Sequence, residues 1–330
     1  MAKKKVNRRK PTLPVQQEAG ADAGDKKQEI YKEIKKTRKL PSPDTTALEI
    51  YRLANKEDID YAKLRKVVEK DPAIASRVMQ LANSAFYRTR LRINSLNSAF
   101  VRLGMKMLGN VALGVSLVSQ NKKGPCVEFD YEGFWSESVA RSVAAWHLAA
   151  ERGKEINTDV AFTAGLLCQI GRLAFATVYP AEYGKVLCSA RAGGSADLLD
   201  HERKAFGMDH NELAAMMMAD WNLPDIYSQA MQYQNSLANQ DDLPAESPAR
   251  KLARMLQWSK AISVILGHTR IPPRKALDIT VKATHLFGIT PDTFGESFDL
   301  IASEWSRLGS VFGVATREVL PWEKIYTQAD

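Results

Sequence analysis

The sequence predicts an all-α fold, and three observations indicate it. Apolar residues recur at helical spacing along most of the chain after Leu40, and acidic or hydroxyl side chains followed by proline repeatedly mark helix starts. The alternation of apolar and polar residues that is typical of strands is almost absent. With 330 residues, 45% of them hydrophobic, the chain is long enough for one large or two modest domains with a real core.

Residues 1–38 are predicted to form a basic, disordered tail. Residues 1–40 hold 13 Lys and Arg and 5 Asp and Glu, a net charge of +8. The whole chain also has a net charge of +8, so residues 41–330 are neutral. The tail has few large apolar residues and is not expected to bury enough surface to offset the entropy of ordering. We expect a solvated arm; the alternative is an arm that contacts nucleic acid, anionic lipid or an acidic partner.

Residues 39–125 are predicted to form an N-terminal helical subdomain. Gly104 is expected to stop or kink a helix before a second apolar segment that runs to Val118. The segment Asn121–Pro125 has loop composition and marks the boundary of the subdomain. Helix starts are expected at Ser42-Pro43, Asp60, Asp71-Pro72 and Ser95.

Residues 126–330 are predicted to form a second helical subdomain, with further helices toward the C-terminus. Asp209 and Glu212 have the spacing of a capping box at the start of a helix. Within that helix Met216, Met217 and Met218 are consecutive and cannot all face one core, so at least one of them is expected to reach a neighbouring helix or a partner. Other helix starts are expected at Asn157 or Thr158 and after Asn222-Leu223-Pro224, with two more helices over 248–267 and 295–313.

Several function classes lack any support in the sequence. No apolar stretch reaches the roughly 20 residues needed to cross a bilayer, so no membrane span is expected. Three cysteines without C-x-x-C spacing fit a reducing compartment, and we expect a cytoplasmic protein. The Gly-rich, G-x-S-x-G and H-E-x-x-H motifs of nucleotide-binding, hydrolase and zinc enzymes are missing, so no cofactor is predicted.

Four blocks of the sequence resemble the HDOD family, and they occur in the family's order. The resemblance implies an all-helical domain that is related to HD phosphohydrolases and is found in bacterial signalling proteins. The blocks are DPAIASRVMQLANSAFY (71–87), SLNSAFVRLGMKMLGNVAL (95–113), AFTAGLLCQIGRLAFA (161–176) and GMDHNELAAMMMADWNLPDIYSQAM (207–231).

The resemblance also implies that a metal site has been lost. Enzymatic HD relatives hold a divalent metal with histidines and an adjacent His-Asp pair, and the metal makes a hydrolytic water. This sequence has Cys168-Gln169 where the pair is expected and Glu137 where a first-helix histidine is expected. A thiol and a neutral amide are poor ligands for a hard cation. We therefore expect no metal and no catalysis. The former active-site cavity, lined by Cys168, Gln169, His210 and Gln234, is expected to persist as a vestigial pocket or as a rigid core contact.

The favoured function is signal transduction by binding a signalling protein or a small ligand. One alternative is nucleic-acid binding by the basic tail together with an arginine-rich region, and residual metal-dependent phosphohydrolase activity is a further one. Cys168 could serve as a nucleophile or redox sensor, but its apolar surroundings favour an inert buried thiol. The arginines of the nucleic-acid alternative are Arg77, Arg88, Arg90 and Arg92.

Overall fold

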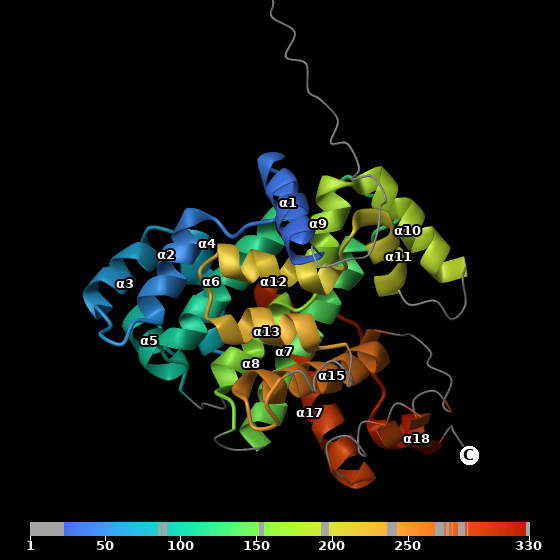
Figure 1. The fold of residues 1–330 in the computed structure, drawn as a ribbon. Coiled ribbons are helices and arrows are strands. Elements are labelled where there is room, and N and C mark those ends of the chain that lie inside the picture. Colours follow the sequence, from blue (N-terminus) through green and yellow to red (C-terminus); the bar gives the residue numbers. More distant parts are fainter. Residues whose placement is uncertain are drawn as a thin grey trace, which may run out of the picture.

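The computed structural model shows helices packed on one another throughout (Figure 1). No strand occurs among the residues that it describes, which confirms the all-α prediction. The described residues are 23–84, 87, 91–151, 155–192, 198–235, 243–267, 274, 277–278, 280–282, 288 and 290–327.

The first group of helices follows the predicted starts, with one correction. The carboxylates of Asp60 and Asp71 and the hydroxyl of Ser95 accept hydrogen bonds from the first turns of their helices, as expected. The cap of the helix expected at Ser42 is instead Asp44, which accepts from the backbone N–H of Ala47 at 2.7 Å. The group comprises α2 (Thr45–Ala54), α3 (Tyr61–Glu69), α4 (Pro72–Ala82), α5 (Leu96–Leu103) and α6 (Met105–Gln120).

Gly104 separates α5 from α6, as the sequence indicates. Its φ of +77° lies in a region that side chains other than glycine rarely adopt. The two helices consequently meet at an angle of 106°. The chain turns sharply there and α6 enters the centre of the fold, where almost all its residues are buried.

The helix α7 (Tyr131–Glu151) is the centre of the second group. α8 (Thr158–Leu167) packs on it so closely that a Cβ on Gly165 would lie 2.5 Å from the carbonyl oxygen of Arg141. α17 (Pro291–Phe312) packs on α7 through a buried pair, with 2.5 Å between His147 Nε2 and Glu304 Oε2. α15 (Pro248–Gly267) also lies against α7, and α18 (Trp322–Thr327) follows α17.

A second layer of helices lies beside α7 and α8. The capping box of Asp209 and Glu212 is present at the start of α12, which confirms the prediction. The rings of Phe175 and Phe206 stack with centroids 4.5 Å apart and join two of these helices. The layer comprises α9 (Ile170–Val178), α10 (Pro180–Ala192), α11 (Leu198–Phe206), α12 (His210–Asp220) and α13 (Asp225–Tyr233).

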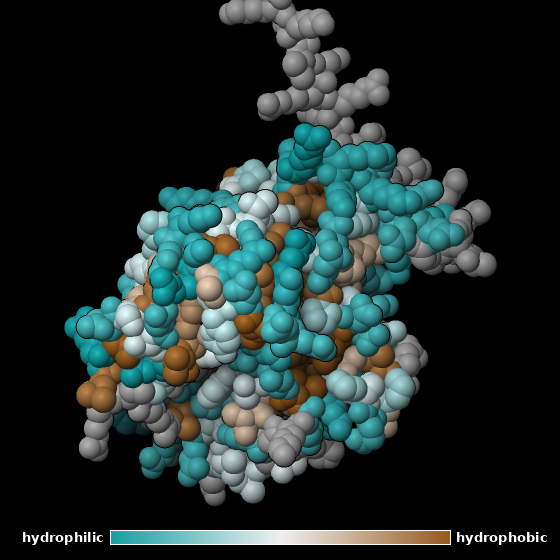
Figure 2. Space-filling view, turned by 90° about the vertical axis from the view of Figure 1, so that its left-hand side faces the viewer, coloured by the Kyte–Doolittle hydropathy of each residue, from teal (hydrophilic) through white to brown (hydrophobic). Residues whose placement is uncertain are grey.

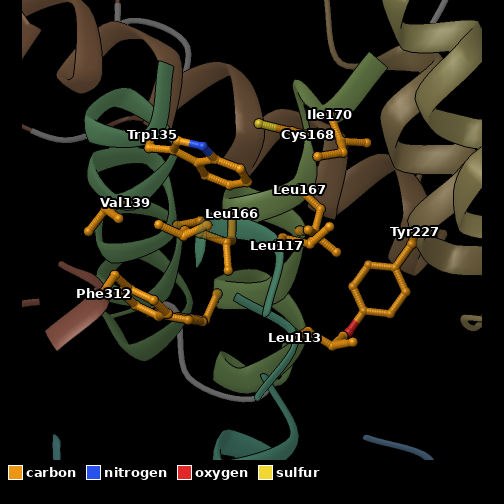
Figure 3. Close-up of a cluster of buried hydrophobic side chains, with 14 of the residues drawn as sticks. Leu113, Leu117, Trp135, Val139, Leu166, Leu167, Cys168, Ile170, Tyr227 and Phe312 are labelled. Atoms are coloured by element: carbon orange, nitrogen blue, oxygen red, sulfur yellow. The ribbon is translucent and has the colours of Figure 1, made fainter. Parts of the chain in front are cut away.

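A single cluster of buried hydrophobic residues includes side chains from both predicted subdomains. Figure 3 shows Leu113 and Leu117 of α6 beside Leu166 and Leu167 of α8, with Phe312 of α17 nearby. The expected boundary at residue 125 falls in the segment that joins α6 to α7, and the core extends across it.

The prediction of disorder over residues 1–38 is wrong for its last part. Residues Ala23–Lys36 form the helix α1, which lies beside α9 and α12 in Figure 1. Tyr31 is 7% exposed and Ile34 is fully buried, so α1 has an apolar face that packs on the rest of the fold. Residues 1–22 of the predicted tail lie outside the described residues.

Most of the surface visible in Figure 2 is hydrophilic, and the one helical stretch among the described residues that is long and apolar enough to cross a membrane is mostly buried. Hydrophilic residues cover most of the face shown in Figure 2, with hydrophobic residues in patches between them. The stretch Thr158–Val178 has the length and composition of a span, but 83% of its apolar window is buried inside the fold. It is therefore a core element here.

Candidate functional site

The Cys168-Gln169 doublet lies at the junction of α8 and α9, where three helices meet. Cys168 ends α8 and Gln169 precedes α9. Gly171, two residues later, approaches the first residue of α12 so closely that an added Cβ would lie 1.9 Å from the carbonyl oxygen of His210. The junction, α7 and the start of α12 together form the candidate site.

Cys168 is a fully buried thiol in this site. Its Sγ donates to the carbonyl oxygen of Gly165 at 3.2 Å and accepts from a terminal nitrogen of Arg141 at 3.5 Å. Burial raises the pKa of the Cys168 thiol, and the nearby guanidinium only partly offsets this effect. The thiol is therefore neutral at pH 7, which disfavours a nucleophilic or redox-sensing role.

Two guanidinium groups lie where the resemblance implies a metal. Glu137 Oε1 accepts from Arg141 Nε at 3.0 Å and from a terminal nitrogen of Arg141 at 2.9 Å. Arg172 donates to Gln169 Oε1 at 3.0 Å, and its nearest terminal nitrogen is 3.8 Å from Glu137 Oε2. Burial alone would raise the pKa of Glu137, but the charges of Arg141 and Arg172 hold that pKa below its usual range.

His210 belongs to a second buried network, centred on Glu202 of α11. Glu202 Oε2 lies 2.6 Å from His210 Nδ1 and accepts the backbone N–H of His210 at 2.9 Å. The hydroxyl of Tyr183 donates to Glu202 Oε1 at 2.9 Å. Burial would raise the pKa of Glu202, but its contacts with His210 and the hydrogen bond from Tyr183 together hold that pKa below its usual range. The histidine thus serves as a hydrogen-bonded partner of a buried carboxylate.

Gln234, at the end of α13, joins the two sides of the site. Its Nε2 donates to the carbonyl oxygen of Cys168 at 2.8 Å and to Asn211 Oδ1 at 2.9 Å. All four predicted residues, Cys168, Gln169, His210 and Gln234, are therefore buried around the α8–α9 junction and make hydrogen bonds there.

The sequence reasoning missed Arg141, Arg172 and Glu202. The spacing of Glu137 and Arg141, four residues apart on one helix, is a local signal for an ion pair. Glu202 lies on the apolar stripe of its helix, where a carboxylate needs a buried partner. No local signal places Arg172 beside Glu137, because their proximity depends on how α9 packs near α7.

A profile of the HDOD domain matches residues 40–237. The chain belongs to the HDOD domain family. The match covers the four sequence blocks and the whole site, while α1, α15, α17 and α18 lie outside it.

Similarity to individual known proteins is distant. A curated relative, an uncharacterized protein of Treponema pallidum, is 23% identical over 60% of this chain, and the aligned part spans only 38% of the relative. A candidate phosphohydrolase of Shewanella amazonensis superposes with a TM-score of 0.68, 24% identity and coverage of 86% of this chain and 97% of the other. A candidate signal transduction protein of Marinobacter aquaeolei superposes with a TM-score of 0.64 and 24% identity, and the match covers 89% of this chain and 66% of the other. At these identities the two structures support the fold alone.

A cleft of about 430 Å³ opens beside the guanidinium network of this HDOD domain. Glu137 and Arg172 line it, and Arg191 and Arg317 also border it. None of the four predicted pocket residues lines this cleft. Glu137 and Arg172 connect the network to solvent at this cleft, while Cys168 and Gln234 are buried in the interior.

The donor set does not fit a divalent metal. Within the described part of the chain, no three His, Cys, Asp or Glu side chains come together in a group that could hold an ion. The carboxylate of Glu137 is already paired with Arg141, and a guanidinium cannot act as a ligand because it has no lone pair to offer.

One arginine of the nucleic-acid alternative has a structural role. Arg77 donates to Gln80 Oε1 at 2.9 Å and to the carbonyl oxygen of Ser310 at 3.2 Å, close to the C-terminus of α17. A cation in that position complements the helix dipole. Arg92 is exposed, and Arg88 and Arg90 lie outside the described residues.

Thiol accessibility tests the burial of the site directly. Cys188 is exposed, whereas Cys126 and Cys168 are buried and burial raises the pKa of both thiols. We expect one fast-reacting thiol per native chain with Ellman's reagent, three thiols after denaturation in urea, and no fast phase in the Cys188→Ser variant. Modification of Cys168 in the native protein at the rate of Cys188 would contradict the buried site.

Proposed function

We propose that this HDOD protein is a non-catalytic regulatory protein that acts by binding a protein partner or a small ligand. The observation that carries the proposal is the Glu137–Arg141–Arg172 network, which fills the place of a metal centre with fixed positive charges. Guanidinium groups repel a divalent cation, so a hydrolytic water cannot be activated there as in an HD phosphohydrolase.

The site chemistry gives no other route to catalysis. Arg141 is held in the interior by Glu137 and Cys168, and Cys168 carries a neutral thiol. His210 is bound to Glu202, which occupies its Nδ1. These contacts stabilise the junction of α8, α9 and α12 and give Arg141, Cys168 and His210 structural partners.

A binding role fits the cleft and the family. The cleft beside Glu137 and Arg172 links the buried network to the surface, so a bound molecule there would contact two members of the network. The description of the Marinobacter protein as a candidate signal transduction protein agrees with a regulatory role for this chain. A cytoplasmic setting and an output through direct contact are parts of the same proposal.

Metal analysis and hydrolase assays test the non-catalytic role. We expect purified protein to contain no stoichiometric magnesium, manganese or iron and to hydrolyse neither bis-p-nitrophenyl phosphate nor p-nitrophenyl phosphate above the background rate. The His210→Ala variant serves as the matched control and should give the same background. Stoichiometric metal, together with turnover that disappears in His210→Ala, would refute the proposal.

A further inference from the structure

The helix α1 is attached to α12 in a fixed register. Lys27 Nζ lies 2.5 Å from Glu212 Oε1, and Lys35 forms an ion pair with Asp220. Both pairs join residues 185 positions apart, so eight residues separate the two contacts on each helix. The two helices therefore run parallel, with ion pairs about 12 Å apart along them.

Between the two ion pairs the contact is apolar. Ile34 is fully buried and Tyr31 is 7% exposed. Ile30 packs at the turn before α12, where a Cβ on Gly207 would lie 2.8 Å from Ile30 Cδ1. Burial and the neighbouring Asp220 carboxylate raise the pKa of Tyr31, and its hydroxyl hydrogen-bonds to that carboxylate. The Asp220 carboxylate thus pairs with the ammonium of Lys35 and accepts a hydrogen bond from the hydroxyl of Tyr31.

The surface of α12 that faces α1 is only partly filled. A groove of about 580 Å³ lies between the helices and is lined by Tyr31 of α1 and by Ala215, Met216 and Ala219 of α12. Small residues let another helix approach closely, and the flexible side chain of methionine adapts to different partners. Met216 is the one member of the methionine run that lines this groove.

The attachment of α1 is weak compared with its length. The helix has 14 residues, but among those whose burial the structure describes only Tyr31 and Ile34 are buried. A helix of this length is marginal by itself, and exposed ion pairs add little. α1 also lies outside the matched HDOD segment 40–237. It is therefore expected to open more readily than the core helices.

We infer that the α12 strip, defined as Glu212, Ala215, Met216, Ala219 and Asp220, is a docking site for a basic amphipathic helix of a partner protein. α1 occupies this strip within the chain and controls access to it. The chemistry of α1 defines the partner: two basic residues eight positions apart, with apolar residues four and seven positions after the first. The inference rests on the proposed binding role, but its test measures helix docking and does not depend on hydrolase activity.

Hydrogen exchange of the full-length protein tests the attachment of α1. The Lys35→Glu variant should raise the exchange rates of the α1 amides about two- to fivefold, because it turns an ion pair into a repulsion. The double variant Lys35→Glu/Asp220→Lys should restore the wild-type exchange rates, because the two charges are swapped and form an ion pair again. Lys32→Glu changes the net charge equally on an exposed position of α1 and should have no effect. Equal effects of Lys32→Glu and Lys35→Glu, or no rescue, would overturn the register.

A labelled peptide of residues 23–38 tests the docking site. We expect it to bind the full-length Ile34→Asp variant, in which α1 is released, at least about tenfold more tightly than the wild type, where α1 competes. Adding Asp220→Lys should weaken that binding, and a peptide carrying Ile34→Asp should not bind. Equal binding to wild type and Ile34→Asp, or no binding to either, would overturn the inference while leaving the non-catalytic role untouched.

Discussion

Replacing Gly171 with alanine is expected to destabilise the fold by about 3 kcal/mol or more. The added Cβ would lie 1.9 Å from the carbonyl oxygen of His210 and 3.0 Å from its Cα. These are backbone atoms, so no side-chain rotation relieves the clash and α9 must move away from α12. That movement would also disturb the hydrogen bonds of Glu202 to His210. Urea unfolding followed by circular dichroism measures the loss.

Gly267 provides a matched control for this substitution. It also lies in a helix, at the end of α15, but a Cβ there would meet no atom within 4 Å. Gly267→Ala should be neutral or slightly stabilising, because alanine has the higher helix propensity. If Gly171→Ala lost no more stability than Gly267→Ala, the close approach of α9 and α12 would be wrong.

Local signals account for what the sequence predicted correctly. The caps at Asp60, Asp71 and Asp209 depend on hydrogen bonds within the next three residues, so their spacing in the sequence suffices. Gly104 marks a sharp turn because of its own backbone conformation. The resemblance, and not a local signal, led to Cys168, Gln169, His210 and Gln234, which the structure brings to one junction.

Tertiary contacts explain what the sequence did not reveal. Asp44 caps α2, and the hydroxyl of Ser116, 72 residues away, donates to its second carboxylate oxygen at 2.7 Å. Disorder was predicted for α1 because its composition is polar, but Tyr31 and Ile34 find apolar partners far along the chain. Nor could spacing show that Arg172 of α9 lies beside Glu137 of α7.

Glu137→Gln is expected to cost about 2–3 kcal/mol of stability at pH 7. The side chain of Arg141 is only 2% exposed, and the substitution leaves its charge in the interior without a carboxylate. Breaking a buried ion pair from one side costs about 3–5 kcal/mol. We expect a smaller loss because the glutamine oxygen can still accept from Arg141 and because Glu137 is 25% exposed. The Glu246→Gln variant, which breaks an exposed pair with Lys251, should be unchanged within error.

The pH dependence of this loss identifies the charge of Glu137 as its cause. Burial would raise the pKa of Glu137, but Arg141, Arg172 and Lys260 together make it lower in the folded chain than in the unfolded one, where it is about 4.3. Its carboxylate therefore stabilises the fold fully above that pH, and the contribution disappears as the pH falls through the folded value. The difference between wild type and Glu137→Gln in urea unfolding should be constant from pH 7 to about pH 5 and should shrink at lower pH. A difference that persisted unchanged into strong acid would mean that shape, and not charge, makes Glu137 important, and the electrostatic argument against a metal at this site would lose its basis.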